Sequence, residues 1–128
     1  GSKPVTRSRS KRAMAYARGR FAEKLCQWVL RAKGYRILET GYRTKVGEID
    51  ILATRGDLLV AVEVKVRATR AAAIEAVTWR QRRRIEKALE WYLRRNPGRG
   101  DTGIRFDVIA MTPWRLPSHI KNAWQGNQ

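Results

Sequence analysis

The chain has 128 residues, 28 of them Lys or Arg and 11 Asp or Glu, which gives a formal net charge of +17. This length accommodates one compact domain, and a hydrophobic share of 43% excludes a wholly disordered chain. A single cysteine and a single histidine exclude an intrachain disulfide and a Cys/His zinc site. The longest aliphatic run, Leu58–Val62, is far shorter than the ~18 residues of a membrane span. We therefore expect a cytoplasmic protein with no membrane partner.

The positive charge extends over the whole chain. The first twenty residues hold seven basic side chains and no acidic one, and the remaining residues still hold 21 basic and 11 acidic side chains. A polyanion is the expected partner, and nucleic acid is the commonest polyanion. The alternative is that the basic surface only aids solubility.

The pattern predicts a flexible basic arm over residues 1–18 and a single domain over residues 19–128. From Arg20, apolar residues at three- and four-residue spacing predict a helix that ends at Gly34. A second helix, entered from residues 69–73, carries one apolar stripe and stops at residues 96–98. Strands are predicted over residues 35–42, 48–53, 58–67 and 104–111, and Pro113 and Pro117 break up the tail. The order αβββαβ indicates an α/β domain with helices packed on a central sheet.

The pair Gly56-Asp57 predicts a hairpin that brings two acids together. Gly-Asp suits a two-residue type II′ turn, and with that turn Asp50 faces Glu63 with Cβ atoms about 4.5–5.5 Å apart. A turn one residue earlier leaves the two acids as diagonal neighbours on one face. The alternation predicts that the valines of residues 62–66 face the core and that Glu63, Lys65 and Arg67 share the other face.

Two opposed carboxylates repel each other unless a cation lies between them. Oxygen ligands favour a hard ion such as Mg²⁺ or Mn²⁺, and Lys65 could orient a water or stabilise charge on a phosphate. In a basic protein this combination suggests metal-assisted hydrolysis of a phosphodiester. The alternative interpretation is that Asp50 and Glu63 are solvent-facing charges paired with Lys65 and Arg67.

The helices add two polar candidates. Glu23 borders the apolar stripe of the first helix, and Gln81 interrupts the stripe of the second, where it either caps a backbone group or reaches toward the site. Most of the five tryptophans are expected to pack in the core or at an interface. Basic side chains near the site or crowded on the second helix are candidate nucleic-acid contacts: Arg43, Lys45, Arg67, Arg80 and Arg83.

Three segments carry a resemblance to a known family: Gly19-Arg20-Phe21-Ala22-Glu23, Gly47-Glu48-Ile49-Asp50-Ile51-Leu52-Ala53 and Val62-Glu63-Val64-Lys65-Val66-Arg67. Together with the later Arg-rich and Phe-Asp-Val segments, they make residues 19–124 resemble the YraN-like family of bacterial proteins. That family looks like a member of the PD-(D/E)XK restriction-endonuclease-like fold, for which archaeal Holliday-junction resolvases are analogues. The resemblance implies an αβββαβ core with a mixed central sheet flanked by helices.

The resemblance also implies roles for individual residues. It makes Asp50 and Glu63 metal-binding acids, Lys65 the catalytic lysine and Glu23 the helix acid that completes the metal site. Gln81 stands where YraN-like sequences usually carry a lysine. The implied function is an Mg²⁺- or Mn²⁺-dependent nuclease that cuts branched or otherwise structured DNA. The alternative is a non-catalytic DNA- or RNA-binding module that retains the nuclease fold, and the oligomeric state stays open, although a homodimer would suit a four-way junction.

Overall fold

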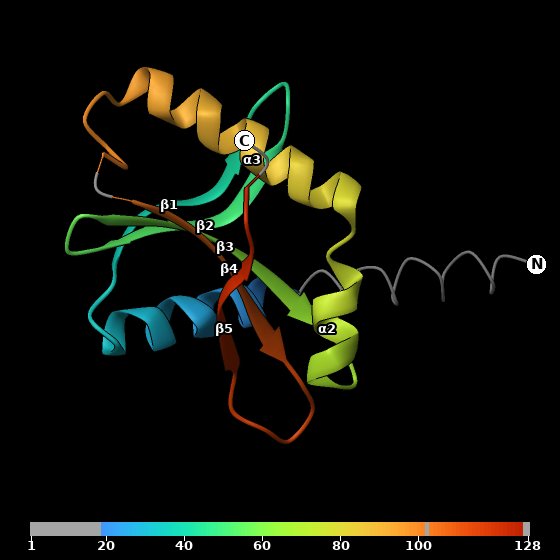
Figure 1. Ribbon diagram of the computed structural model, residues 1–128. Coiled ribbons are helices and arrows are strands. Elements are labelled where there is room, and N and C mark those ends of the chain that lie inside the picture. Colours follow the sequence, from blue (N-terminus) through green and yellow to red (C-terminus); the bar gives the residue numbers. More distant parts are fainter. Residues whose placement is uncertain (1–18, 102, 127–128) are drawn as a thin grey trace, which may run out of the picture.

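The computed structural model describes residues 19–101 and 103–126, so the arm predicted over residues 1–18 lies outside the described residues. The described part forms one five-stranded sheet in the order β1-β2-β3-β4-β5, with helices on both faces (Figure 1). The strands are β1 (Arg36–Arg43), β2 (Glu48–Arg55), β3 (Leu58–Val66), β4 (Ile104–Met111) and β5 (Ser118–Trp124). Only β3 and β4 pair in parallel, which makes the sheet mixed and confirms the predicted α/β class. The arrangement is consistent with a restriction-endonuclease-like fold.

The N-terminal helix, described over residues 19–32, covers one face of the sheet (Figure 1). It ends where the sequence predicts, because Gly34 adopts a φ of +92°. The N–H groups of Gly34 and Tyr35 donate to the carbonyls of Arg31 and Leu30, the bonding pattern of a Schellman motif. Cys26 and Leu30 on this helix are fully buried against the sheet.

The prediction of one continuous second helix is wrong. The chain forms α2 (Arg70–Ala76) and α3 (Trp79–Arg95), separated at Val77 and Thr78. Thr78 has an extended backbone, and its hydroxyl accepts a hydrogen bond from the Gln81 N–H at 3.1 Å, which caps α3. The longer helix, α3, crosses the face of the sheet opposite the N-terminal helix (Figure 1).

The sequence also missed β5, because two prolines interrupt the segment that leads into it. This strand is attached to β4 by a fully buried carboxylate, Asp107. Asp107 Oδ1 accepts from the Asn122 N–H at 3.0 Å, and Oδ2 lies 2.7 Å from His119 Nε2. Arg105 donates twice to the same carboxylate, so the role of Asp107 is to hold β4 and β5 together. Burial would raise the pKa of Asp107, but the hydrogen bonds from His119 and Arg105 lower it overall.

The β2–β3 hairpin has the predicted register. Pairing runs from Arg55↔Leu58 to Ile51↔Val62, and Gly56 supplies the positive φ of +60° that a type II′ turn needs at its first position. Beyond Ile51↔Val62 the backbone ladder stops. The next residue of β2 on that side is Asp50, at the end of the hairpin away from the turn.

The alternative interpretation of Glu63 as a solvent-facing charge is wrong, because α3 covers its side of the sheet. Leu59 and Ala61 pack toward α3, while Val60 and Val62 pack toward the N-terminal helix. Glu63 follows Ala61 on the α3 side and is only 5% exposed. The charged side chains of β3 therefore lie between the sheet and α3. Val66, which the sequence predicts in the core, is 45% exposed.

Candidate active site

Asp50 is fixed between the ends of β2 and β3 by a bond to the backbone. Its Oδ2 accepts from the Val64 N–H at 2.8 Å, where a regular ladder would use a carbonyl. The residue before β2, Gly47, lies against the backbone of α3. A Cβ on Gly47 would lie 1.8 Å from the Arg84 carbonyl oxygen. Only glycine fits this approach, so the position of Asp50 depends on Gly47.

Glu63 is the centre of a small polar network. Its Oε1 accepts from Gln81 Nε2 at 3.0 Å and lies 3.6 Å from Lys65 Nζ. Gln81 therefore reaches the site, as one of the two sequence alternatives proposed, and the Thr78 cap sets the helical turn from which it does so. The Lys65 side chain is 14% exposed, so its ammonium group is also largely withdrawn from water.

The two acids hold a proton between them. Burial, together with the charge and hydrogen bond of Asp50, raises the pKa of Glu63 to about 9 against the opposing effect of Lys65. Burial also raises the pKa of Asp50, although the Val64 N–H and Glu63 oppose this shift. In the absence of another cation, the pair therefore carries a proton at neutral pH.

Glu23 approaches the same site from the N-terminal helix. Burial and the charge of Asp50 raise the pKa of Glu23, and Arg20 opposes them. Glu23, Arg20, Asp50 and Arg43 all line a cavity of about 320 Å³. Arg20 is not among the site residues predicted from the sequence, although its i, i+3 spacing from Glu23 on one helix face is a signal for it.

The donor set fits a hard divalent ion. Asp50 and Glu63 share a proton that a cation could replace, and Glu23 lies on the other side of Asp50 as a third carboxylate. Within residues 19–101 and 103–126, however, no three or more His, Cys, Asp or Glu side chains are already gathered as a metal cluster. The site is thus a carboxylate pair with a neighbouring acid.

Four of the five basic candidates are exposed. Arg43 lines the cavity and lies 3.8 Å from Glu48, Lys45 lies in the β1–β2 connection, and Arg67 follows Lys65 just beyond β3. Arg80 is exposed in the first turn of α3. Arg83 is half-buried and tied by Nη1 to Glu86 Oε1 at 3.1 Å, so its guanidinium group already has a carboxylate partner.

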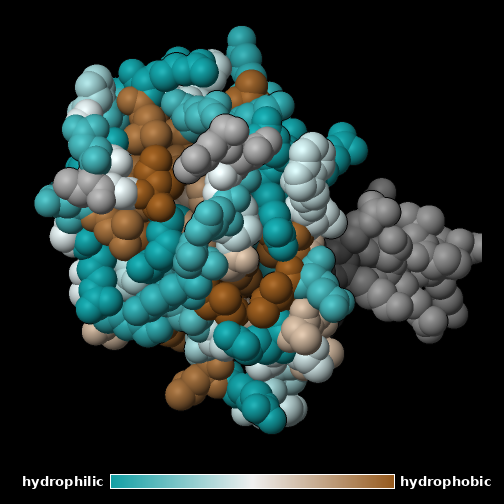
Figure 2. Space-filling view, in the orientation of Figure 1, coloured by the Kyte–Doolittle hydropathy of each residue, from teal (hydrophilic) through white to brown (hydrophobic). Residues whose placement is uncertain are grey.

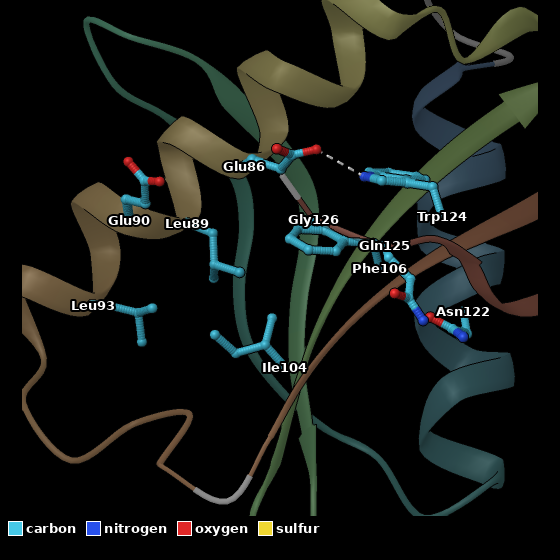
Figure 3. Close-up of a pocket in the computed structure, with 10 residues that line it drawn as sticks. All are labelled: Glu86, Leu89, Glu90, Leu93, Ile104, Phe106, Asn122, Trp124, Gln125 and Gly126. Atoms are coloured by element: carbon cyan, nitrogen blue, oxygen red, sulfur yellow. Dashed lines mark hydrogen bonds between the residues drawn. The ribbon is translucent and has the colours of Figure 1, made fainter. Parts of the chain in front are cut away.

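A second pocket, of about 400 Å³, lies between α3 and the C-terminal strands (Figure 3). Leucine, isoleucine and aromatic side chains make up half of its lining residues, and its charged lining residues are Glu86 and Glu90. Glu86 Oε2 accepts from Trp124 Nε1 at 3.1 Å across this pocket (Figure 3). Without a lining Lys or Arg, the pocket does not suit a phosphate.

Comparison with known proteins identifies the family. The family described as "Uncharacterised protein family UPF0102" matches residues 22–111, a span that contains Glu23, Asp50, Glu63, Lys65 and Gln81. The chain belongs to UPF0102. This is the YraN family, so the resemblance found in the sequence is confirmed.

Three bacterial UPF0102 proteins illustrate the similarity. The protein of Mesorhizobium japonicum is 46% identical over 120 residues, which cover 94% of this chain and 96% of the relative. The protein of Paramagnetospirillum magneticum is 48% identical over 115 residues, which cover 87% and 89%. The protein of Bartonella henselae is 44% identical over 123 residues, which cover 96% and 98%. These names give a family without an activity, so the reaction is argued from the site.

In the part of the chain that the structure describes, no helix is long and apolar enough to cross a membrane.

Proposed function

We propose that this UPF0102 protein is a divalent-metal-dependent nuclease that hydrolyses phosphodiester bonds in DNA, with branched or otherwise structured DNA as its substrate and the bacterial cytoplasm as its location. The observation that carries the proposal is the pair of half-buried Asp50 and buried Glu63, with the Lys65 ammonium 3.6 Å from Glu63. A buried acid pair that shares a proton is costly to the fold, and a bound divalent ion would remove that cost.

Each residue of the site has a distinct proposed role. Asp50 and Glu63 would hold Mg²⁺ or Mn²⁺, with Glu23 as a third carboxylate. When bound, such an ion lowers the pKa of a water molecule and neutralises charge that develops on the phosphate. Lys65 holds the attacking water or stabilises the phosphate oxygens as water adds to phosphorus and the P–O bond breaks. Gln81 orients Glu63 through its 3.0 Å hydrogen bond and is a positioning residue.

The charge of the chain supports a nucleic-acid substrate. A net charge of +17 favours association with a polyanion. Arg43 lines the cavity that Asp50 lines, and Lys45, Arg67 and Arg80 are exposed. These side chains would contact phosphates on either side of the bond that is cut, with Arg83 available only if its pair with Glu86 opens.

Cleavage by wild type and an Asp50→Asn variant tests the proposal. With Mn²⁺, wild type is expected to cut at least one of a four-way junction, a flap or a single strand, and Asp50→Asn is expected to lose cleavage while keeping its DNA affinity. Asp57→Asn is the matched control, because Asp57 is exposed at the hairpin turn, about 23 Å along the strand from Asp50. Equal cleavage by wild type and Asp50→Asn would trace the activity to a contaminant and reject the proposal.

A second candidate is a non-catalytic DNA- or RNA-binding module. It is favoured by one observation, that the described residues contain no ready cluster of three metal ligands. In that case nucleic-acid binding would need no metal. The logarithm of the affinity would fall linearly with the logarithm of the salt concentration, with a slope set by the number of phosphate contacts. Competition between DNA and RNA duplexes would then identify the ligand.

A further inference from the structure

The connection between β4 and β5 exposes two large hydrophobic side chains. Trp114 is 102% and Leu116 88% exposed, the highest values among large hydrophobic residues in the described part of the chain. This connection projects from the lower end of the molecule in Figure 1, and Figure 2 shows hydrophobic surface at that end. The sequence predicts core or interface packing for most of the tryptophans. Trp124 packs in the core, whereas Trp28, Trp79 and Trp114 are exposed.

The exposed Trp114 also has an unusual backbone conformation. Trp114 has a φ of +62°, a conformation that is unfavourable for a bulky residue and costs on the order of 1–3 kcal/mol. An exposed aromatic side chain held in a strained conformation brings the fold no packing energy in return. Such strain persists where the surrounding structure imposes it, and it commonly marks a ligand-binding segment.

The loop is braced at both ends. At its start, the Arg67 N–H donates to the Met111 carbonyl at 3.1 Å, and within the loop the Arg115 N–H donates to the Thr112 carbonyl at 3.4 Å. At its end, Arg70 Nε donates to Ser118 Oγ at 3.0 Å, which ties the loop to the start of α2. Trp114 is therefore presented on a supported loop.

A basic cavity lies behind this loop. It has a volume of about 620 Å³ and is formed by the residues around Thr69, at the start of α2, and those around Leu116 in the loop. Its charged lining residues are Arg70 and Arg115, and no carboxylate is among the lining residues. Two guanidinium groups and two threonine hydroxyls in one cavity suit a phosphate group.

The loop is close to the proposed cleavage site. Lys65 pairs with Ala110 across the β3–β4 ladder, and Trp114 follows four residues later. With at most about 3.5 Å per residue and 4.8 Å between strands, the two Cα atoms lie no more than about 19 Å apart. At 3.4 Å per nucleotide, this upper limit corresponds to no more than about six nucleotides of a helical strand.

We propose that residues 112–117 and the cavity behind them bind a DNA strand outside the cut, with Arg70 and Arg115 on a phosphate and Trp114 stacked on an unpaired base. The inference deepens the proposed function and rests on it for the choice of DNA as ligand. A base inside an intact duplex offers no free face to the indole, whereas a flap or a branch point does. The loop therefore gives this protein a preference for DNA with unpaired bases.

The test compares the binding of a flap and of a duplex of the same sequence to wild type and Trp114→Ala, by fluorescence anisotropy in EDTA so that nothing is cut. We expect Trp114→Ala to weaken flap binding roughly 5- to 100-fold and duplex binding less than twofold. Trp28→Ala is the matched control, since Trp28 is 68% exposed on the N-terminal helix, and it should leave both affinities unchanged. Arg115→Ala should weaken both and reduce the salt slope by about one.

Unchanged flap binding by Trp114→Ala, or equal losses for flap and duplex, would overturn the inference, as would a loss of the same size in Trp28→Ala. A single-stranded RNA that displaces the flap more effectively than DNA of the same sequence would overturn the assignment to DNA. Because binding is measured without metal, the outcome is separable from the nuclease test. Loss of flap binding in Trp114→Ala without cleavage by wild type would support this loop and reject the nuclease.

Discussion

The proton shared by Asp50 and Glu63 predicts how the stability of the metal-free protein depends on pH. The pKa of Glu63 is raised to about 9 in the folded protein, against an ordinary value of 4.5. Between these values the folded state binds a proton that the unfolded state releases, so the free energy of unfolding falls as pH rises. The stabilisation by the bound proton is fully present below pH 4.5. It is lost progressively until the pH passes the folded-state pKa of about 9.

Glu63→Gln removes this loss, because glutamine has nearly the shape of a protonated glutamate and does not titrate. One bound proton changes the free energy of unfolding by about 1.4 kcal/mol per pH unit. Relative to wild type, Glu63→Gln should therefore gain about 3 kcal/mol between pH 5 and pH 7.

Urea denaturation in EDTA at pH 5, 6 and 7 measures this gain. Glu75→Gln, a replacement of an exposed glutamate on α2, controls for the loss of one negative charge from a strongly positive protein. A difference between Glu63→Gln and wild type that stays constant across the three pH values would refute the shared proton.

Three further variants test the supports of the site. Thr78→Ala removes the cap that accepts from Gln81 and should cost about 1 kcal/mol in urea denaturation, together with slower cleavage; unchanged stability would contradict the cap. Gly47→Ala places a Cβ 1.8 Å from a carbonyl oxygen of α3 and should lower the melting temperature by several degrees. Gly19→Ala, with open space around its Cβ, is the control and should not lower it. Equal melting temperatures of the two variants would contradict the close approach. Lys65→Met should slow cleavage at saturating Mn²⁺ at least tenfold with DNA affinity within about twofold, and unchanged cleavage would remove Lys65 from the mechanism.

The sequence predicted the hairpin correctly because its information is local. A Gly-Asp turn and a period of two residues determine which residues face each other, and a slip of one residue would turn Asp50 against Val62. The same local reasoning identified Gln81 as an unusual amide in an apolar stripe. The structure then resolved the two alternatives for its side chain, since Gln81 bonds to Glu63.

The errors come from contacts between distant parts of the chain and from one missed cap. The break at Thr78 was predictable, because Thr78 and Gln81 have the Thr-x-x-Gln spacing of a capping box. The burial of Glu63 was not, because it depends on where α3 crosses the sheet. Likewise β5 depends on the bonds of Asp107 to residues more than ten positions away, which no periodicity in the sequence reveals.

Calorimetric titration of Mn²⁺ into the metal-free protein at pH 7, repeated in buffers of different ionisation enthalpy, tests the carboxylate pair most directly. The shared proton predicts that wild type binds the ion with release of about one proton per chain, and that Asp50→Asn, which has lost one of the two carboxylates, binds it far more weakly. Absence of binding to wild type, or equal binding to Asp50→Asn, would contradict a metal site at Asp50 and Glu63.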